Sequence, residues 1–198
     1  MAPVIVPTDK LREFVDFDAF YAWLAENHDS ADEIWIRIFK KATGKPTISP
    51  VDAIQAVLCW GWIDAIKKSW DEESFVQRYC PRRPKSVWSQ VNRDNVARLV
   101  EQGLMTEHGL VHVETAKADG RWDAAYKTTQ EAPPDLLAAI AASPAAQAKY
   151  GQLTAQNRFA LTFRTLSLKT EAARKKRIAE FVAMLERGET IYPQRDKP

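Results

Sequence analysis

Residues 59–80, CWGWIDAIKKSWDEESFVQRYC, contain two strand-like runs in close succession. Residues 62–70 and 74–80 are both rich in Trp, Ile, Phe, Val and Tyr, the residue types that favour strands. The polar triplet at residues 71–73 separates them. Two such runs joined by a short polar turn predict a β-hairpin, which needs a further strand or a covering helix to be stable.

A third strand is expected before the hairpin, at residues 33–41 (EIWIRIFKK), where isoleucines alternate with Trp, Arg and Phe. Between this strand and the hairpin, Ser49 is a suitable cap for a helix over residues 51–60, because it is followed by a proline that suits a helix start. An earlier helix fits residues 18–27, with Asp18 as its cap. These elements together predict a small sheet with helices packed on it.

The chain after Pro84 has the pattern of helices. Residues 87–102 place apolar side chains three and four positions apart, and a glycine follows. The last long helix is expected over residues 171–187, again with a glycine after it. The connection at residues 126–134 is the least regular and is the candidate seam between the two halves.

The expected fold class is therefore α+β. A small antiparallel sheet of about three strands in the N-terminal half packs with helices, and a mostly helical C-terminal half follows. We expect an α+β domain over residues 1–125 and a helical region over residues 135–190. The helical region either belongs to the same domain or forms a separate one.

Composition limits the class of protein. With 198 residues, 45% of them hydrophobic, the chain can form one substantial core or a core with a smaller unit. The formal net charge of +2 is too small to indicate nucleic-acid binding by itself. Acidic residues are concentrated in residues 1–35 and basic residues in residues 158–187. Either these charges pair with each other or face the solvent, or the basic segment forms a surface that binds a polyanion.

The sequence predicts no membrane span, because no stretch reaches the ~18 apolar residues that a span requires. The first residues lack the pattern of a secretory signal. Cys59 and Cys80 are the two cysteines, which suits free thiols in a reducing compartment. We therefore expect a cytoplasmic protein.

A candidate anion site lies at residues 81–86 (PRRPKS), where the hairpin ends and the helix at residues 87–102 is expected to begin. The first backbone N–H groups of a helix have no partner within the helix and attract anions. Basic and hydroxyl side chains would converge on the same place; they are Arg82, Arg83, Lys85, Ser86 and Ser89. The alternative is that the arginines pair with acidic residues of the first third while Ser86 only caps the helix.

Tryptophans near this segment could form walls of the site. Trp62, Trp88 and Trp122 suit stacking on a ligand, although a tryptophan is as readily a core residue. Asp64 follows Trp62 and would point toward the arginines, either as a salt-bridge partner or as a general base.

Other chemistry has little support in the sequence. His108 and His112 are four residues apart, but a third metal ligand at a motif spacing is missing. The chain has no glycine-rich nucleotide turn and no Gly-x-Ser-x-Gly elbow. We expect no metal and no cofactor.

Seven blocks of the sequence resemble the bacterial YdeI/OmpD-associated family, in the same order from about Phe20 to Gly188. They are FYAWL (20–24), IWI (34–36), CWGWID (59–64), PRRPKSVWS (81–89, with Asn92), GLM (103–105), GRW (120–122) and TEAARKKRI (170–178). The resemblance implies a link to resistance against bacteriocins and cationic antimicrobial peptides and an association with an outer-membrane porin. It implies no established catalytic activity. The PRRPKSVWS block coincides with the anion site, and Arg121 with Trp122 would complete that site.

The favoured function is a cytoplasmic stress or antimicrobial-peptide-resistance factor that binds an anionic small molecule or protein partner. Its expected ligand-binding residues are Arg82, Arg83, Lys85, Ser86, Trp62, Trp88, Ser89, Asn92, Arg121 and Trp122. One alternative is an enzyme acting on a phosphorylated or acyl substrate, with Asp64 as its base. A second alternative is a nucleic-acid-binding protein that uses the basic residues 174–177. A third alternative is a scaffold that binds only other proteins.

Overall fold

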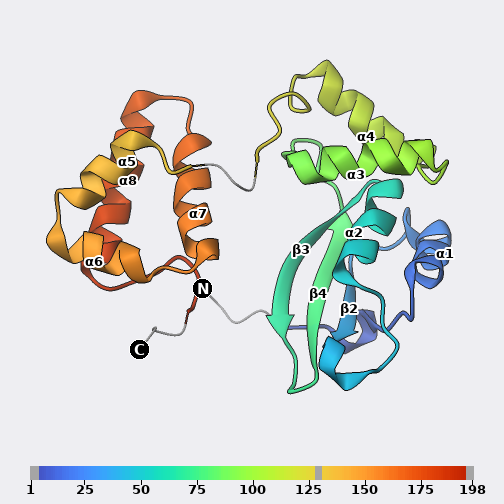
Figure 1. Cartoon of the computed structure of the whole chain (residues 1–198). Helices are drawn as coiled ribbons and strands as arrows, with labels where there is room; N and C mark the ends of the chain where they lie inside the picture. The colour runs from blue at the N-terminus through green and yellow to red at the C-terminus, as the bar shows by residue number, and fades with distance from the viewer. Residues whose placement is uncertain (1–4, 128–130, 195–198) are drawn as a thin grey trace. The chain divides into compact units, whose positions relative to one another are not determined.

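A computed structural model describes residues 5–127 and 131–194 of the chain. The chain divides into two compact units, Met1–Tyr126 and Lys127–Pro198. The mixed α+β class is confirmed, because the sheet lies in the first unit and the second is helical (Figure 1). Among the described residues, every helix is too short or too polar to cross a bilayer.

The first unit contains a four-stranded sheet in the order β1-β2-β4-β3 (Figure 1). The strands are β1 (Leu11–Arg12), β2 (Ile34–Phe39), β3 (Trp62–Ser69) and β4 (Ser74–Pro81). The β3–β4 hairpin is confirmed, and β2 pairs with β4 in antiparallel register. The expected count of about three strands is corrected to four. The additional strand, β1, is parallel to β2 and only two residues long, too short to show an alternating pattern.

Four α-helices and two short 3₁₀ helices accompany this sheet in the part of the first unit that the structure describes. They are η1 (Thr8–Lys10), α1 (Phe17–Asn27), η2 (Lys41–Thr43), α2 (Pro50–Cys59), α3 (Gln90–Glu101) and α4 (Glu107–Ala118). Ser49 caps α2 as predicted, accepting a hydrogen bond from the Asp52 amide. The cap of α1 is Asp16, not Asp18 as predicted. Asp16 has an extended backbone and accepts from the Ala19 amide, whereas Asp18 already lies in the first helical turn.

The start of α3 also differs from the prediction. The helix begins at Gln90 with Ser89 as its cap, not at residue 87, and Ser89 Oγ accepts from the Asn92 amide at 3.2 Å. The two residues before the cap have other partners: Val87 O accepts from Arg82, and Trp88 O accepts from the Tyr126 amide. Residues 82–89 therefore form a segment without helix or strand.

Three apolar clusters hold the first unit together, and the smallest contains Val6, Trp35 and Val76. The largest, which includes Phe20, Ile36, Val57, Trp62 and Tyr79, lies between the sheet and helices α1 and α2. The remaining one joins α2 to α3 and α4. The end of α2 and the start of α4 approach closely at a glycine: a Cβ added to Gly109 would lie 2.4 Å from Cys59 O. Gly109 thus allows α4 to pack against the end of α2.

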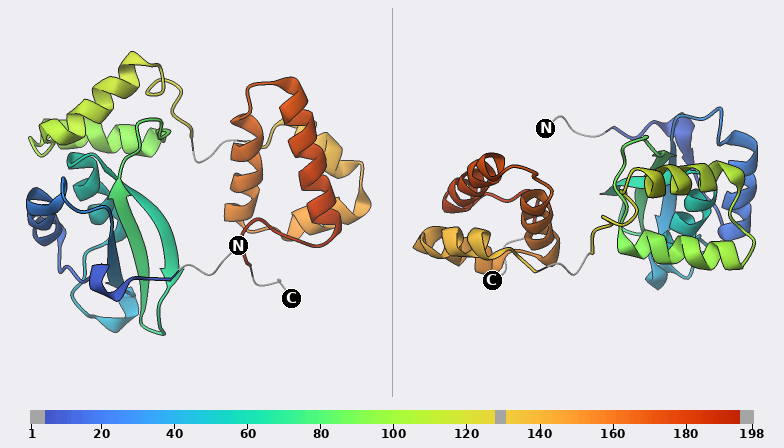
Figure 2. Two further views of the ribbon diagram at one scale, coloured as in Figure 1. Left: turned by 180° about the vertical axis from the view of Figure 1, so that it is seen from behind. Right: turned by 90° about the horizontal axis from the view of Figure 1, so that it is seen from above.

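Four helices make up the second unit over residues 131–194: α5 (Pro134–Ala141), α6 (Pro144–Gln152), α7 (Ala155–Leu166) and α8 (Glu171–Glu186) (Figure 2). They enclose a core of their own, with Leu136, Ile140, Leu161, Phe181 and Leu185 among its buried members. The predicted helix at residues 171–187 is confirmed within one residue.

Candidate functional site

Arg82 is a buried arginine at the end of the hairpin. It is only 4% exposed, and its backbone N–H donates to Gly61 O at 2.9 Å. Its Nη1 donates to Val87 O at 3.1 Å, and its guanidinium carbon lies 3.8 Å from the centre of the Trp88 ring. The stacking on Trp88 and the bond to Val87 fix the plane of the guanidinium.

The other two nitrogens of Arg82, Nε and Nη2, are buried without a hydrogen-bond partner among the residues the structure describes. These two N–H groups form the edge of a guanidinium that binds both oxygens of a carboxylate or phosphate. Trp88 Nε1 and Tyr79 Oη are likewise buried and unpartnered within the described chain. Buried polar groups are nearly always hydrogen-bonded, so the two orphan nitrogens on one edge of Arg82 indicate a place that a bound molecule or water would complete.

Asp64 lies opposite Tyr79 in the hairpin, immediately before an irregularity in the pairing. The register moves from Asp64↔Tyr79 to Lys67↔Gln77, so two residues of β3 face one of β4. Such β-bulges often occur beside active sites, where they redirect a side chain. The Gln77 amide donates to Asp64 Oδ2 at 3.5 Å, a long hydrogen bond that leaves the carboxylate weakly satisfied.

The electrostatics around Arg82 reflect its burial and the charges of Asp64 and Arg121. Burial lowers the pKa of Arg82 to about 10, and Asp64 partly opposes this shift. Burial raises the pKa of Asp64, and Arg82 opposes that shift in turn. The pKa of His112 is lowered by burial and by the positive charges of Arg82 and Arg121. An anion placed here would therefore be attracted by Arg82 and opposed by Asp64, while the charge of Arg121 is already paired with Asp119.

Arg121 and Trp122 adjoin the segment at residues 82–89. Arg121 Nη1 donates to Ser86 O at 2.8 Å, while its Nη2 pairs with Asp119 at 2.7 Å. The Trp122 ring lies 4.9 Å from that of Trp88 in an edge-to-face arrangement. The structure therefore brings five of the predicted site residues together: Arg82, Ser86, Trp88, Arg121 and Trp122.

Other predicted residues lie elsewhere or have different partners. Arg83 and Lys85 are exposed, whereas Arg82 is buried. Trp62 lies in the core beside α1 and donates its indole N–H to His28 O at 3.0 Å. Ser89 and Asn92 form the cap of α3, so the first turn of that helix is already satisfied in part.

Three residues near Arg82 were missed by the sequence interpretation. His112 was considered only as a metal ligand, although it lies against Gly61: a Cβ added there would be 2.6 Å from His112 Cδ2. Tyr126, which lies in the expected seam, pairs its backbone with Trp88 and Gln90. Tyr79, which lies opposite Asp64 on β4, is predicted only as a strand residue. Local sequence carries no signal for His112 and Tyr126, because each lies on a segment distant in the chain from Arg82.

The ring of His108 packs against two other aromatic rings. Its centroid lies 4.1 Å from that of His28 and 5.7 Å from that of Trp60. Over residues 5–127 and 131–194, no three His, Cys, Asp or Glu side chains are placed to hold a metal ion.

The basic run on α8 is largely paired within the second unit. Arg174 binds Asp135 at 2.6 Å, Lys175 binds Glu171 at 2.7 Å, and Arg177 lies 3.0 Å from Glu180. Phosphate contacts would have to compete with these ion pairs, so the geometry favours a solvated helix over a nucleic-acid interface.

Two family models match the chain. One, described as a domain of unknown function (DUF8412), matches residues 12–112. The other, described as "Bacteriocin-protection, YdeI or OmpD-Associated" (OmdA), matches residues 129–188 and confirms the resemblance to that family. The blocks between residues 20 and 105 fall in the first model, which therefore contains Arg82 and its loop. No curated protein and no solved structure matches the chain.

Proposed function

Because the chain belongs to the DUF8412 family and carries a YdeI/OmpD-associated segment at residues 129–188, we propose that it is a binding protein of this kind whose first unit holds a small anion at Arg82. The observation that supports this is the unpartnered Nε and Nη2 edge of a 96% buried guanidinium, since 4% of the residue is exposed. A carboxylate or phosphate that accepts from both nitrogens would satisfy them.

The burial of Arg82 favours one class of anion. A second negative charge on the ligand would strengthen the attraction to Arg82 and the repulsion from Asp64 alike, so charge alone does not separate the two classes. A doubly charged phosphate, however, loses more hydration than a singly charged carboxylate when it enters a buried site. The preferred ligand is therefore a small monocarboxylate, with phosphate as the weaker competitor.

Entry to the site requires movement of residues 82–89. Both orphan nitrogens are covered by surrounding atoms. The segment at residues 82–89, whose Trp88 stacks on the guanidinium, has neither helix nor strand, and it is held by hydrogen bonds from Arg121 to Ser86 O and from the Tyr126 amide to Trp88 O. Anion association is therefore expected to be slower than diffusion, because it waits for this segment to open.

The test is titration of the intact protein with acetate, propionate and inorganic phosphate, followed by the indole N–H signals of the tryptophans in ¹⁵N spectra. The Trp88 signal is expected to shift saturably, and propionate is expected to bind more tightly than phosphate. Arg82→Lys keeps the charge but removes the two-nitrogen edge, so its affinity should fall about tenfold or more.

Arg83→Lys is the matched control, because it changes the exposed neighbouring arginine in the same way. Its affinity should equal that of the unaltered protein. Circular dichroism of both variants checks that each is folded. Absence of a saturable shift with all three anions, or equal affinity in Arg82→Lys, would refute the proposal.

The proposal includes a cytoplasmic role in stress or peptide resistance. The matching family is described by bacteriocin protection, and both cysteines of this chain are free thiols, as a reducing compartment requires. Deletion of the gene should lower survival under bacteriocin or cationic-peptide challenge. Expression of the unaltered protein in the deletion strain should restore survival, and expression of Arg82→Lys should not. Full restoration by Arg82→Lys would show that the resistance role does not depend on the anion site.

A further inference from the structure

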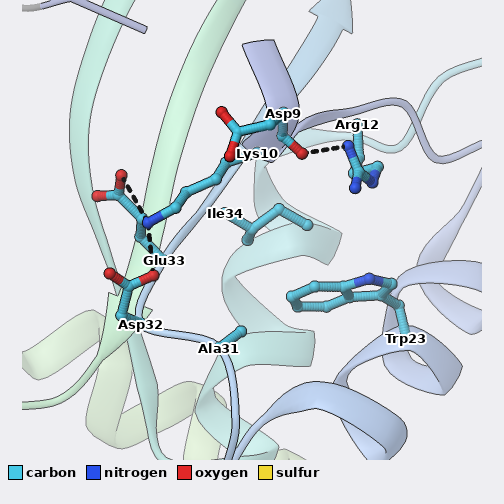
Figure 3. Close-up of a pocket in the computed structure, with 8 residues that line it drawn as sticks. All are labelled: Asp9, Lys10, Arg12, Trp23, Ala31, Asp32, Glu33 and Ile34. Atoms are coloured by element: carbon cyan, nitrogen blue, oxygen red, sulfur yellow. Dashed lines mark hydrogen bonds and ion pairs between the residues drawn. The ribbon is translucent and has the colours of Figure 1, made fainter. Parts of the chain in front are cut away.

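Charged side chains of the first unit commonly pair in direct contact. In the crevice drawn in Figure 3, Lys10 Nζ lies 2.6 Å from Asp32 Oδ1 and 3.6 Å from Glu33 Oε1. Arg82 and Asp64 are an exception: in the part of the chain that the structure describes, neither contacts a side chain of opposite charge. Burial dominates the pKa of both, and each also shifts the pKa of the other toward the charged form. They are therefore opposite charges that interact without an ion-pair contact.

The carboxylate of Asp64 is poorly compensated for the water it has lost. Its side chain is half-buried, and the hydrogen bond that it accepts from the Gln77 amide is long, at 3.5 Å. Tyr79 pairs opposite Asp64 across the hairpin, and its hydroxyl is buried without a partner among residues 5–127 and 131–194. A charged group in such surroundings is costly, and a proton on Asp64 would remove that cost.

The cluster around this pair holds further titratable groups, which are Tyr79, Cys80, Tyr126, His112 and Arg121. Burial raises the pKa of the two tyrosines and of the thiol and lowers that of the histidine, so all four are neutral near pH 7. Arg121 is positive, but its charge is paired with Asp119 at 2.7 Å. The cluster itself therefore carries one positive and one negative charge, on Arg82 and Asp64.

An anion on the Nε and Nη2 edge of Arg82 would change this balance. It would add a second negative charge near Asp64 and would engage the positive charge that now stabilises the Asp64 carboxylate. A net charge in a buried cluster is costly, because the interior screens and solvates it poorly. One proton restores neutrality, and Asp64 is the negatively charged group of the cluster that can accept it.

We infer that the Arg82 site binds its anion together with one proton, which passes from the solvent to Asp64. The inference rests on the proposed function and adds its regulation by pH. Because the bound anion favours the protonated form of Asp64, protonation of Asp64 favours the anion by the same factor. Affinity should therefore rise as pH falls, and it should level off once Asp64 is already protonated without the anion.

The experiment is calorimetric titration of the full chain with propionate at about pH 6 to 8, where the ligand itself stays ionised. Each titration is repeated in two amine buffers that differ in ionisation enthalpy, so the difference in heat gives the number of protons taken up per anion. Uptake should increase as pH falls, toward about one proton, and affinity should rise by up to about tenfold per pH unit.

Two substitutions of one kind in the same hairpin locate the proton. Asp64→Asn should bind propionate without proton uptake and independently of pH, and at pH 8 it should bind about tenfold more tightly than the unaltered protein. Asp71→Asn is the matched control, because this carboxylate is already bound by Ser74 and Arg37. It should take up as many protons per anion as the unaltered protein.

The outcomes separate this inference from the proposed function. Saturable binding without proton uptake, or a pH dependence that persists in Asp64→Asn, would overturn the inference and leave the anion site at Arg82 intact. Absence of saturable binding by the unaltered protein would refute the proposed function, and the inference with it.

Discussion

Asp64 is a carboxylate whose ionisation works against folding, because burial raises its pKa above the ordinary value of 3.8. The folded state then holds the proton more tightly than the unfolded state, so stability falls as pH rises from 3.8 through the raised value. Asp64→Asn cannot ionise and should unfold at higher urea concentration than the unaltered protein at pH 7. The difference should shrink toward pH 3. A variant less stable at pH 7 would contradict this account.

Asp71 provides the opposite case within the same hairpin. Hydrogen bonding from Ser74 is the main cause that lowers the pKa of Asp71 to about 2, and Arg37 contributes. The stabilisation is therefore present above 3.8 and is lost as pH falls toward 2. Asp71→Asn should be less stable than the unaltered protein at pH 7 and approach it in acid. Urea unfolding of Asp64→Asn and Asp71→Asn over one pH series checks that their stability differences from the unaltered protein have opposite signs at pH 7.

At the scale of elements, the contact between α2 and α4 depends on the absence of a side chain at Gly109. A methyl group there would lie 2.4 Å from Cys59 O and 2.6 Å from Leu58 O, both backbone atoms that cannot turn away. Gly109→Ala should therefore destabilise the first unit by about 1–3 kcal/mol, despite the better helix propensity of alanine.

Gly151 is the matched control, since it lies in α6 with nothing within 4 Å of an added Cβ. Gly151→Ala should stabilise the protein by about 0.5–1 kcal/mol, because alanine loses less backbone entropy in a helix. Thermal unfolding of the two variants measures both effects. Equal shifts in the same direction would show that helix propensity, and not the close approach, dominates at Gly109.

At the scale of the whole molecule, each unit has a core of its own, so the two are expected to unfold separately. Leu161→Ala removes a 1% exposed side chain from the core of the second unit and should cost about 2–5 kcal/mol. Hydrogen exchange should then speed up in α5–α8, while β2 and β4 keep their protection. Loss of protection in both units would show that they unfold as one.

Much of the fold could be predicted because its signals are local. The β3–β4 hairpin follows from two strand-like runs around a polar turn, and the start of α2 follows from Ser49 and the proline after it. The change from an α+β half to a helical half follows from the spacing of apolar residues. The two-residue β1 could not be predicted, since it exists only through its pairing with β2.

The sequence by itself determined the α+β class and the β3–β4 hairpin, because turns and apolar periodicity act between residues close in the chain. Only the tertiary structure decided that Arg82 is buried while Arg83 is exposed, and that α3 starts at Gln90 with Ser89 as its cap. It also decided that His112 comes near Arg82. The physical reason is that burial and electrostatic neighbours are provided by segments that lie far apart in the sequence.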